Sequence, residues 1–185
     1  MVKDVIAKMN SNMDKSIDSL RKEYQRVRTG RATTSLLDEV KVDSYGSLAP
    51  LNQVATLAVP EARTITIQPW DAKQIQAIEK AIMNSNIGLT PANDGKIIRL
   101  SLPPLTEERR KDLVKQLKRD AEDAKVAVRN IRRDAIDGLK KLEKDKQISE
   151  DELKRAEKDV QDFTNAHVAK IDEVFAHKEK EVMEV

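Results

Sequence analysis

The 185-residue sequence contains no cysteine, and only 3% of its residues are aromatic. The absence of cysteine excludes disulfide bonds, thiol nucleophiles and cysteine-ligated metals. No apolar run approaches the roughly 20 residues that a membrane-spanning helix needs. The first ten residues lack the apolar core of a signal peptide, and they carry an early acid, unlike a transit peptide. We therefore expect a protein of the reducing cytoplasm.

Motifs for catalysis and for metal binding are also missing. The two histidines, His167 and His177, have no third ligand and no i,i+4 partner, so His167 is expected to pack within an apolar stripe. No serine lies in a nucleophile motif, and Gly88 and Gly95 stand alone instead of forming a phosphate-binding loop. The single tryptophan, Trp70, could be an exposed contact, but a lone tryptophan of a small domain is more often found at the edge of a core, which is the position we expect. We expect no enzymatic activity, no metal and no cofactor.

Charged residues, by contrast, make up 36% of the chain, and their signs are unevenly distributed. Residues 1–30 carry a net charge of +3, and residues 31–105 are neutral. Residues 106–147 carry +4, from fourteen basic and ten acidic side chains, whereas residues 148–185 carry −5, from six basic and eleven acidic ones. Local patches should therefore determine the partners of this protein more than its net charge of +2 does.

Apolar residues recur at gaps of three and four in three long segments, which predicts three amphipathic helices. The segments run from Val2 to Val27, from Leu113 to Leu142, and from Leu153 to Val182, with Phe163 and His167 in the third stripe. Such charged rods are not stable alone in water, so we expect them to pack together as a bundle.

The predicted helix ends agree with this assignment. Thr106 precedes two glutamates and predicts the start of the second helix, where a cap and acids are favourable. Ser149 and Glu152 have the spacing of a capping box for the third helix. Gly138 costs about 1 kcal/mol inside a helix, and we expect it to be tolerated where two helices approach closely.

The segment between the first and second helices shows strand and turn patterns. Strands are predicted around Val40 and Val42, at 54–59, at 64–67 and at 97–102, with a turn at Tyr45-Gly46, and a short helix is predicted from about Ala72 to Ser85. We therefore expect a small α/β domain of residues 31–104, inserted into a helical domain formed by residues 1–29 and 106–185. The two crossings between these domains predict a hinge, which consists of Thr29, Gly30, Arg31, Pro103, Pro104 and Leu105.

The second helix has basic residues along one flank of its apolar stripe and aspartates along the other. The basic flank consists of Lys111, Lys118, Lys125, Arg129 and Arg132. It could bind RNA phosphates, or it could form salt bridges with the acidic third helix, and periodicity alone leaves both interpretations open. Three arginines within five residues, Arg129, Arg132 and Arg133, favour RNA, because their planar guanidinium groups match phosphate. The scarcity of aromatic residues favours folded RNA over stacked single strands.

Several strings resemble those of bacterial ribosome recycling factors, over the full length of the chain. They are RTGRA at 28–32, SLLDEVKVD at 35–43 with the following Tyr45-Gly46, LPPLTEERRKDL at 102–113, VAVRNIRRDA at 126–135 and ISEDE at 148–152. The sequence departs from the family at Ser44, where a second tyrosine is frequent, and at Thr90, where asparagine is usual. These two departures concern contacts of the small domain.

The resemblance implies an α+β fold with two domains: a long antiparallel three-helix bundle with an inserted small β/α/β sandwich domain, in an L shape. It further implies a monomer that binds the post-termination ribosome in the intersubunit space. There the family acts with elongation factor G and GTP to split the subunits and to release mRNA and tRNA. The bundle would contact large-subunit rRNA, and the small domain would face the small subunit. The ribosome-contacting arginines of the family correspond to Arg28, Arg129 and Arg132.

Two other classes of protein are considered from the sequence. A coiled-coil adaptor would use the same apolar stripes for protein partners, and its binding would depend little on salt. A peptide-release hydrolase would need a Gly-Gly-Gln-like tip or a nucleophile, and the sequence has neither.

Overall fold

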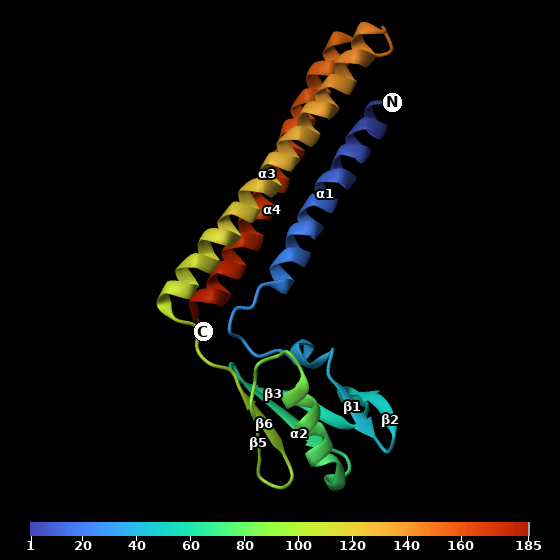
Figure 1. Ribbon diagram of the computed structural model, residues 1–185. Helices are drawn as coiled ribbons and strands as arrows, with labels where there is room; N and C mark the ends of the chain where they lie inside the picture. Colours follow the sequence, from blue (N-terminus) through green and yellow to red (C-terminus); the bar gives the residue numbers. More distant parts are fainter. Residues whose placement is uncertain (185) are drawn as a thin grey trace. The chain divides into compact units, whose positions relative to one another are not determined.

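The computed structural model describes residues 1–184, which form two compact units, each with its own core (Figure 1). One unit is helical and consists of Met1–Arg28 and Glu107–Glu184; the other comprises Thr29–Thr106 and contains two antiparallel sheets and a helix. The predicted α+β class with two domains is confirmed. None of the helices in the described part of the chain is both long and apolar enough to cross a membrane.

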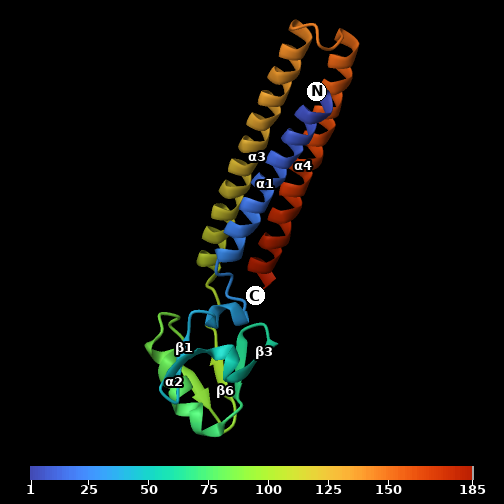
Figure 2. The ribbon, with the colours of Figure 1, turned by 90° about the vertical axis from the view of Figure 1, so that its right-hand side faces the viewer.

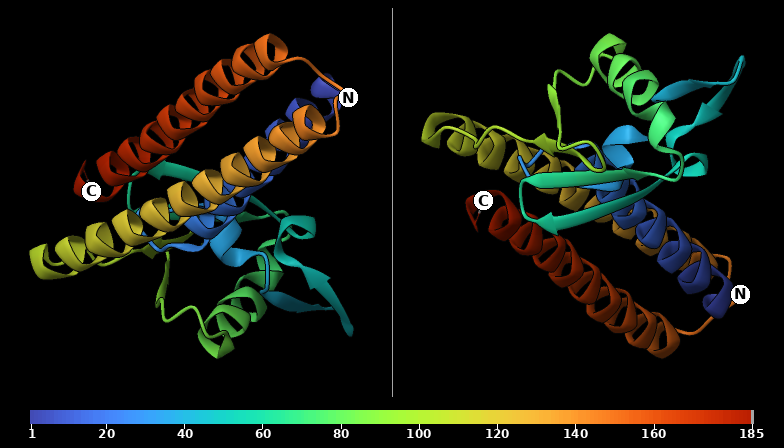
Figure 3. Two further views of the ribbon diagram at one scale, coloured as in Figure 1. Left: turned by 90° about the horizontal axis from the view of Figure 1, so that it is seen from above. Right: turned by 90° about the horizontal axis from the view of Figure 1, so that it is seen from below.

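The helical unit is a bundle of three long helices, α1 (Val2–Arg26), α3 (Glu107–Lys144) and α4 (Glu150–Glu184). They run side by side in every view, with α3 antiparallel to its two neighbours (Figures 1, 2 and 3). The predicted apolar stripes form the core: its most deeply buried side chains include Met13, Leu117, Val128, Leu139, Val160 and Ile171. The long antiparallel three-helix bundle is therefore confirmed.

The stripe of α4 differs from the prediction at one position. Phe163, expected in the core, is 41% exposed, whereas Thr164 is 4% exposed and takes its place. With Thr164, the buried positions of α4 run from Val160 through His167 to Ile171 at gaps of four, three and four residues. Its hydroxyl donates to the Val160 carbonyl over 2.7 Å, so that burial leaves no unpaired polar group. Hydrophobicity alone therefore predicted Phe163 as the core residue, whereas the adjacent Thr164 is the one that is buried.

The predicted capping box of α4 is present. The backbone N–H of Glu152 donates to Oγ of Ser149 over 3.1 Å, and the N–H of Ser149 donates to Oε2 of Glu152 over 2.8 Å. The prediction for Gly138 is not confirmed. A Cβ at that position would lie 3.9 Å from Cγ1 of Val5, an ordinary contact, so no close helix approach requires a glycine there.

The second unit contains a hairpin and a four-stranded sheet, both antiparallel. Strands β1 (Lys41–Ser44) and β2 (Ser47–Pro50) form the hairpin. The sheet has the order β3-β4-β6-β5, with β3 at Ala55–Glu61, β4 at Thr64–Pro69, β5 at Pro91–Asn93 and β6 at Ile98–Ser101. The turn between β1 and β2 needs a positive φ at both central residues, and Tyr45 and Gly46 have φ of 51° and 86°.

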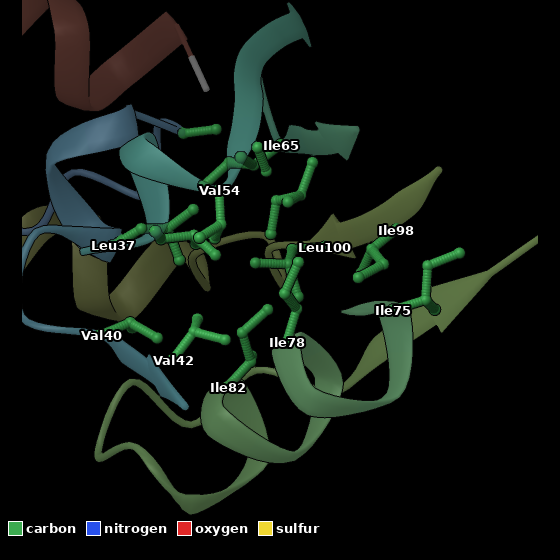
Figure 4. Packing of buried hydrophobic residues seen from close by; sticks show 14 residues of the cluster. Leu37, Val40, Val42, Val54, Ile65, Ile75, Ile78, Ile82, Ile98 and Leu100 are labelled. Carbon is green, nitrogen blue, oxygen red and sulfur yellow. The ribbon is translucent and has the colours of Figure 1, made fainter. Parts of the chain in front are cut away.

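Helix α2 (Ile75–Asn84), preceded by a 3-10 turn at Ala72–Gln74, covers this unit's core (Figure 4). Ile78 and Ile82 of α2 are fully buried and point towards Val42 of the hairpin and Leu100 of the sheet. Two further 3-10 turns, Thr34–Leu37 and Leu51–Gln53, contribute Leu37 and Leu51 to the same core. The expected small domain thus has a continuous apolar centre.

Trp70 does not lie where the sequence suggested. It is 66% exposed instead of lining the edge of the core, and its Nε1 donates to Oγ1 of Thr56 over 2.9 Å. Aliphatic side chains fill the core without it, so the indole remains on the surface with its one polar group paired.

Candidate RNA-binding surface

The basic flank of α3 is divided by its contact with α4. Lys125 is only 16% exposed, and its Nζ lies 2.6 Å from Oδ1 of Asp172 and 3.5 Å from Oε1 of Glu122. The hydrogen bond that Lys125 donates to Asp172 is the main reason why the pKa of Lys125 is raised above its ordinary value of 10.5. Lys125 therefore agrees with the salt-bridge interpretation of the flank, because it serves the contact between the two helices.

Arg132 also faces α4. Its Nη1 donates to Oε1 of Gln161 over 2.6 Å, and Gln161 in turn donates to Oδ1 of Asn165 over 2.8 Å. The Nε atom of Arg132 is buried and finds no hydrogen-bond partner within residues 1–184. The guanidinium group is thus partly used by the bundle, although no carboxylate binds it.

Three of the predicted RNA contacts on α3 remain available. Lys118, Arg129 and Arg133 are exposed, and none of them forms a hydrogen bond or an ion pair with any described residue. Lys111 is exposed as well, with Glu107 one helical turn away at 2.9 Å, and so exposed a pair leaves its charge accessible. Of the predicted RNA contacts on α3, the accessible ones are therefore Lys111, Lys118, Arg129 and Arg133.

Arg28 lies elsewhere on the helical unit. It lines a surface hollow of about 560 Å³. The hollow is also lined by Arg26 and by four side chains of α3, namely Arg109, Leu113, Gln116 and Asp120. Arg129 is sixteen residues beyond Leu113, which corresponds to about 24 Å along α3. The structure therefore does not bring Arg28 together with Arg129, Arg132 or Arg133.

The wall of this hollow carries acids as well as arginines. Burial and the neighbouring charges of Glu23 and Asp123 raise the pKa of the Asp120 carboxyl. Two of these acids, Glu23 and Asp120, line the hollow. An anion that enters it would therefore have to approach from the side of the arginines.

The predicted hinge residues flank two backbone anchors of the small unit. The N–H of Ala32 donates to the carbonyl of Ala62 over 2.7 Å, and the N–H of Leu102 donates to that of Arg63 over 2.8 Å. Both crossing segments are thereby fixed to one turn, between β3 and β4. Gly30, just before the first anchor, has a φ of 76°, which favours glycine.

His167 is packed within the seam, as its place in the stripe suggested. It is 5% exposed; its Nε2 lies 2.9 Å from Oδ1 of Asp14, and its Nδ1 lies 2.7 Å from the Phe163 carbonyl. Within residues 1–184 no group of three His, Cys, Asp or Glu side chains is placed to hold a metal ion.

Gln161 and Asp172 of α4, which bind Arg132 and Lys125, were not predicted from the sequence. A signal for them exists in the chain. The turn at Asp145–Ser149 joins two antiparallel helices, so that residues at similar distances before and after it face each other. Counting outwards from the centre of the turn places Arg132 near 162 and Lys125 near 169, within about one helical turn of the observed partners.

Comparison with known proteins agrees with the resemblance described above. The model of one protein family, described as ribosome recycling factor, matches residues 20–183. The ribosome-recycling factor of Citrifermentans bemidjiense is 83% identical over 185 residues, and that of Geobacter sulfurreducens is 75% identical; both alignments cover the whole of each chain.

Solved structures give the same result. A solution structure of a ribosome recycling factor is 42% identical and has a TM-score of 0.72; the alignment covers 100% of this chain and 98% of that one. A second match has 47% identity and a TM-score of 0.61, with 98% of each chain covered. It represents the T. thermophilus ribosome recycling factor and the E. coli elongation factor G bound to the E. coli post-termination complex. The chain belongs to the ribosome recycling factor family.

Proposed function

We propose that the protein binds the post-termination ribosome in the intersubunit space and, with elongation factor G and GTP, splits the subunits so that mRNA and tRNA leave. The similar recycling factor bound with elongation factor G to a post-termination complex supports this proposal. The protein acts as a monomer in the cytoplasm and is not itself an enzyme. GTP belongs to its partner.

The exposed guanidinium groups of Arg129 and Arg133 carry the RNA-binding part of the proposal. Neither group is neutralised within the described part of the chain, so both can contact phosphate oxygens without breaking a contact of the bundle. Lys118 and Lys111 add point charges along the same helix. Arg132 supports the surface from its edge, and Arg28 adds a contact near the start of α3. Lys125 is left out of this set.

The hinge supplies the mechanical part of the proposal. The helical unit holds large-subunit rRNA, and the small unit, which faces the small subunit, turns about residues 29–31 and 103–106 when elongation factor G pushes it. Because the anchors at Ala32 and Leu102 join one turn of the small unit, that unit can move as a single body. The force then reaches the contacts between the subunits.

Sedimentation of the protein with post-termination ribosomes, with and without elongation factor G and GTP, tests this function. The protein alone should bind, and its binding should decrease steeply between 50 and 200 mM salt, as expected for phosphate contacts. The complete mixture should convert 70S ribosomes into free subunits. A mixture that leaves the ribosomes intact would refute the recycling function.

A cross-link tests the hinge separately. The chain has no natural cysteine, so Arg31→Cys and Pro104→Cys can be joined by a short thiol cross-linker. The cross-linked protein should bind ribosomes as the parent does but fail to split them. The same variant without the cross-linker is the control. Full splitting by the cross-linked protein would exclude a moving hinge.

A further inference from the structure

A second basic surface lies on α1, on the side opposite the bundle core. The core side of α1 contains Met9, Met13, Ile17, Leu20 and Tyr24. The opposite ridge, at gaps of three and four, contains Lys8, Ser11, Lys15, Ser19, Lys22 and Arg26, and all six are exposed. We call these six residues the α1 ridge. Figure 2 looks at α1 from the side that faces away from α3 and α4.

No acid interrupts the α1 ridge, and no partner neutralises it. Asp18 lies beside the ridge, where it pairs with Arg21 over 3.3 Å, and Asp4 precedes the ridge and pairs with the N-terminal amine over 2.7 Å. Lys8, Lys15 and Lys22 form neither a hydrogen bond nor an ion pair with any residue from 1 to 184. Three uncompensated ammonium groups therefore stand in line, about 10.5 Å apart.

The exposed ridge of α4, on the side opposite its core residues, shows that a solvent-facing helix surface need not carry charges of one sign. Its exposed charges are of both signs, three acidic and three basic, and they belong to Asp151, Arg155, Lys158, Asp162, Glu173 and Lys180. A helix that needs only solubility can use either pattern, but mixed signs avoid repulsion along the face. The like charges of the α1 ridge repel one another, which an anionic partner would relieve.

The composition of the ridge indicates which anion it fits. Protein interfaces have a core of apolar and aromatic side chains, and the ridge has none. Lysine, arginine and serine are side chains that contact phosphate oxygens of nucleic acids. The two serines between the lysines are short, so they let a backbone approach closely and offer it hydroxyl donors. Without aromatic side chains for stacking, the ridge suits the phosphates of folded RNA.

We propose that the α1 ridge is a second RNA-binding surface of the helical unit, which contacts the phosphate backbone of folded RNA on a face distinct from that of Arg129 and Arg133. Arg26 belongs both to this ridge and to the hollow that contains Arg28. The ridge thus extends the predicted contact of Arg28 over about 27 Å along α1. This inference rests on the proposed function, because it assumes that ribosomal RNA is the ligand.

Charge neutralisation tests the ridge. A variant with Lys8→Gln, Lys15→Gln and Lys22→Gln removes three charges and breaks no ion pair of the bundle. A variant with Lys158→Gln, Lys170→Gln and Lys180→Gln removes the same charge from exposed positions of α4. Glutamine has nearly the helix propensity of lysine, so both variants should retain the melting temperature of the parent within about 2 °C.

Binding of each variant to isolated large ribosomal subunits is measured across a salt series. The α1 variant should have a slope of log K against log salt that is shallower by about 2 to 3, because each phosphate contact contributes about 0.7 to 0.9. The α4 variant should keep the slope of the parent. An unchanged slope for the α1 variant, or an equal decrease for both, would overturn the inference.

The same series includes Arg129→Ala/Arg133→Ala, which separates this inference from the proposed function. If only that double variant has a shallower slope, the α1 ridge is excluded and the α3 surface stands. If only the α1 variant does, the ridge stands and the α3 surface is excluded. If neither changes, RNA binding by the helical unit fails altogether, and the ridge fails with it.

Photo-cross-linking identifies what covers the ridge. A benzophenone side chain is placed at Ser11 or Ser19 and, as a control, at Ala169 on the exposed ridge of α4. Irradiation of the complex with large subunits should join Ser11 and Ser19 positions to rRNA and leave the control unlinked. Cross-links to ribosomal proteins alone, or no cross-links, would contradict the proposal.

Discussion

Lys125 and Arg132 face a different environment from Arg129 and Arg133, although all four lie within nine residues of one helix. Asp172 and Gln161 of α4 hold the first two, whereas the guanidinium groups of the other two remain exposed and unpaired within residues 1–184. Arg132 has the same side chain as Arg129 and Arg133, so residue type does not explain the difference. The difference comes from which side of α3 the neighbouring helix covers, so a basic stripe can both stabilise a bundle and bind an external anion.

The comparison predicts first that Arg132 and Arg129 contribute differently to stability. Arg132→Ala should lower the free energy of unfolding by about 1–2 kcal/mol, because Gln161 loses a charged donor in a partly buried place. Arg129→Ala and Arg133→Ala should change it by less than about 0.5 kcal/mol. Urea denaturation followed by circular dichroism measures all three. Equal stability of the Arg132 and Arg129 variants would remove the distinction.

The second prediction extends the comparison to the hydroxyl group of Tyr24, which is buried between α1 and α3. Tyr24 is 3% exposed, and its hydroxyl donates to the Leu117 carbonyl over 2.5 Å. Tyr24→Phe should therefore cost about 1 kcal/mol at neutral pH. The loss is measured by the same urea titration, and an exposed tyrosine changed in the same way, Tyr45→Phe, is the control.

The cost of Tyr24→Phe should decrease at alkaline pH. Burial, followed by the charges of Asp120 and Glu23, raises the pKa of the Tyr24 phenol above its ordinary value of 10.0. The contribution of a group with a raised folded-state pKa is complete below the unfolded pKa and is lost as the pH rises through the folded one. The stability difference between parent and variant should shrink above pH 10, and a constant difference would contradict this account.

A third prediction concerns Gly138, whose substitution should add stability without changing the contacts of Lys125 and Arg132 or the exposure of Arg129 and Arg133. Gly138→Ala should raise the free energy of unfolding by about 0.5–1 kcal/mol, because alanine favours the helix and its methyl group has room beside Val5. Ribosome affinity should remain that of the parent. Destabilisation would show that α1 and α3 approach more closely here than the 3.9 Å contact indicates.

The smallest expected effect is the coupling between Lys125 and Asp172. A double-mutant cycle with Lys125→Ala and Asp172→Ala should give about 0.5 kcal/mol, because Asp172 is 59% exposed and water screens the pair. The coupling should decrease further in 1 M salt. A coupling of zero at low salt would mean that Lys125 is not held by α4 and remains available to RNA.

Much of this fold follows from periodicity and from turn chemistry. The three helices, the capping box at Ser149 and the Tyr45-Gly46 turn were predictable because each depends on residues close together in the chain. Phe163 and Trp70 were not, because packing against other elements decides whether a large apolar side chain is buried. The division of the basic flank was missed for a similar reason, since a helical wheel of α3 does not contain α4.

The candidate site was predictable in type but not in membership. Composition and charge pattern indicated a basic surface on α3, and the resemblance to the family supplied Arg28. The unpaired lysines of α1 were overlooked, although the gaps of seven between Lys8, Lys15 and Lys22 are visible in the sequence. The basic residues of α1 are fewer than those of α3, so this second surface is less conspicuous in the sequence although no acid belongs to it.

The most direct test of the central claim is the salt dependence of binding to large subunits for Arg129→Ala/Arg133→Ala. Arg155→Ala, an exposed arginine of α4 without a partner in the described chain, is the matched control. If the unpaired arginines of α3 bind rRNA, the slope of log K against log salt becomes shallower by about 1.4 to 1.8, and the control keeps the parent slope. A double variant that retains the parent slope would show that this side of α3 does not contact RNA phosphates.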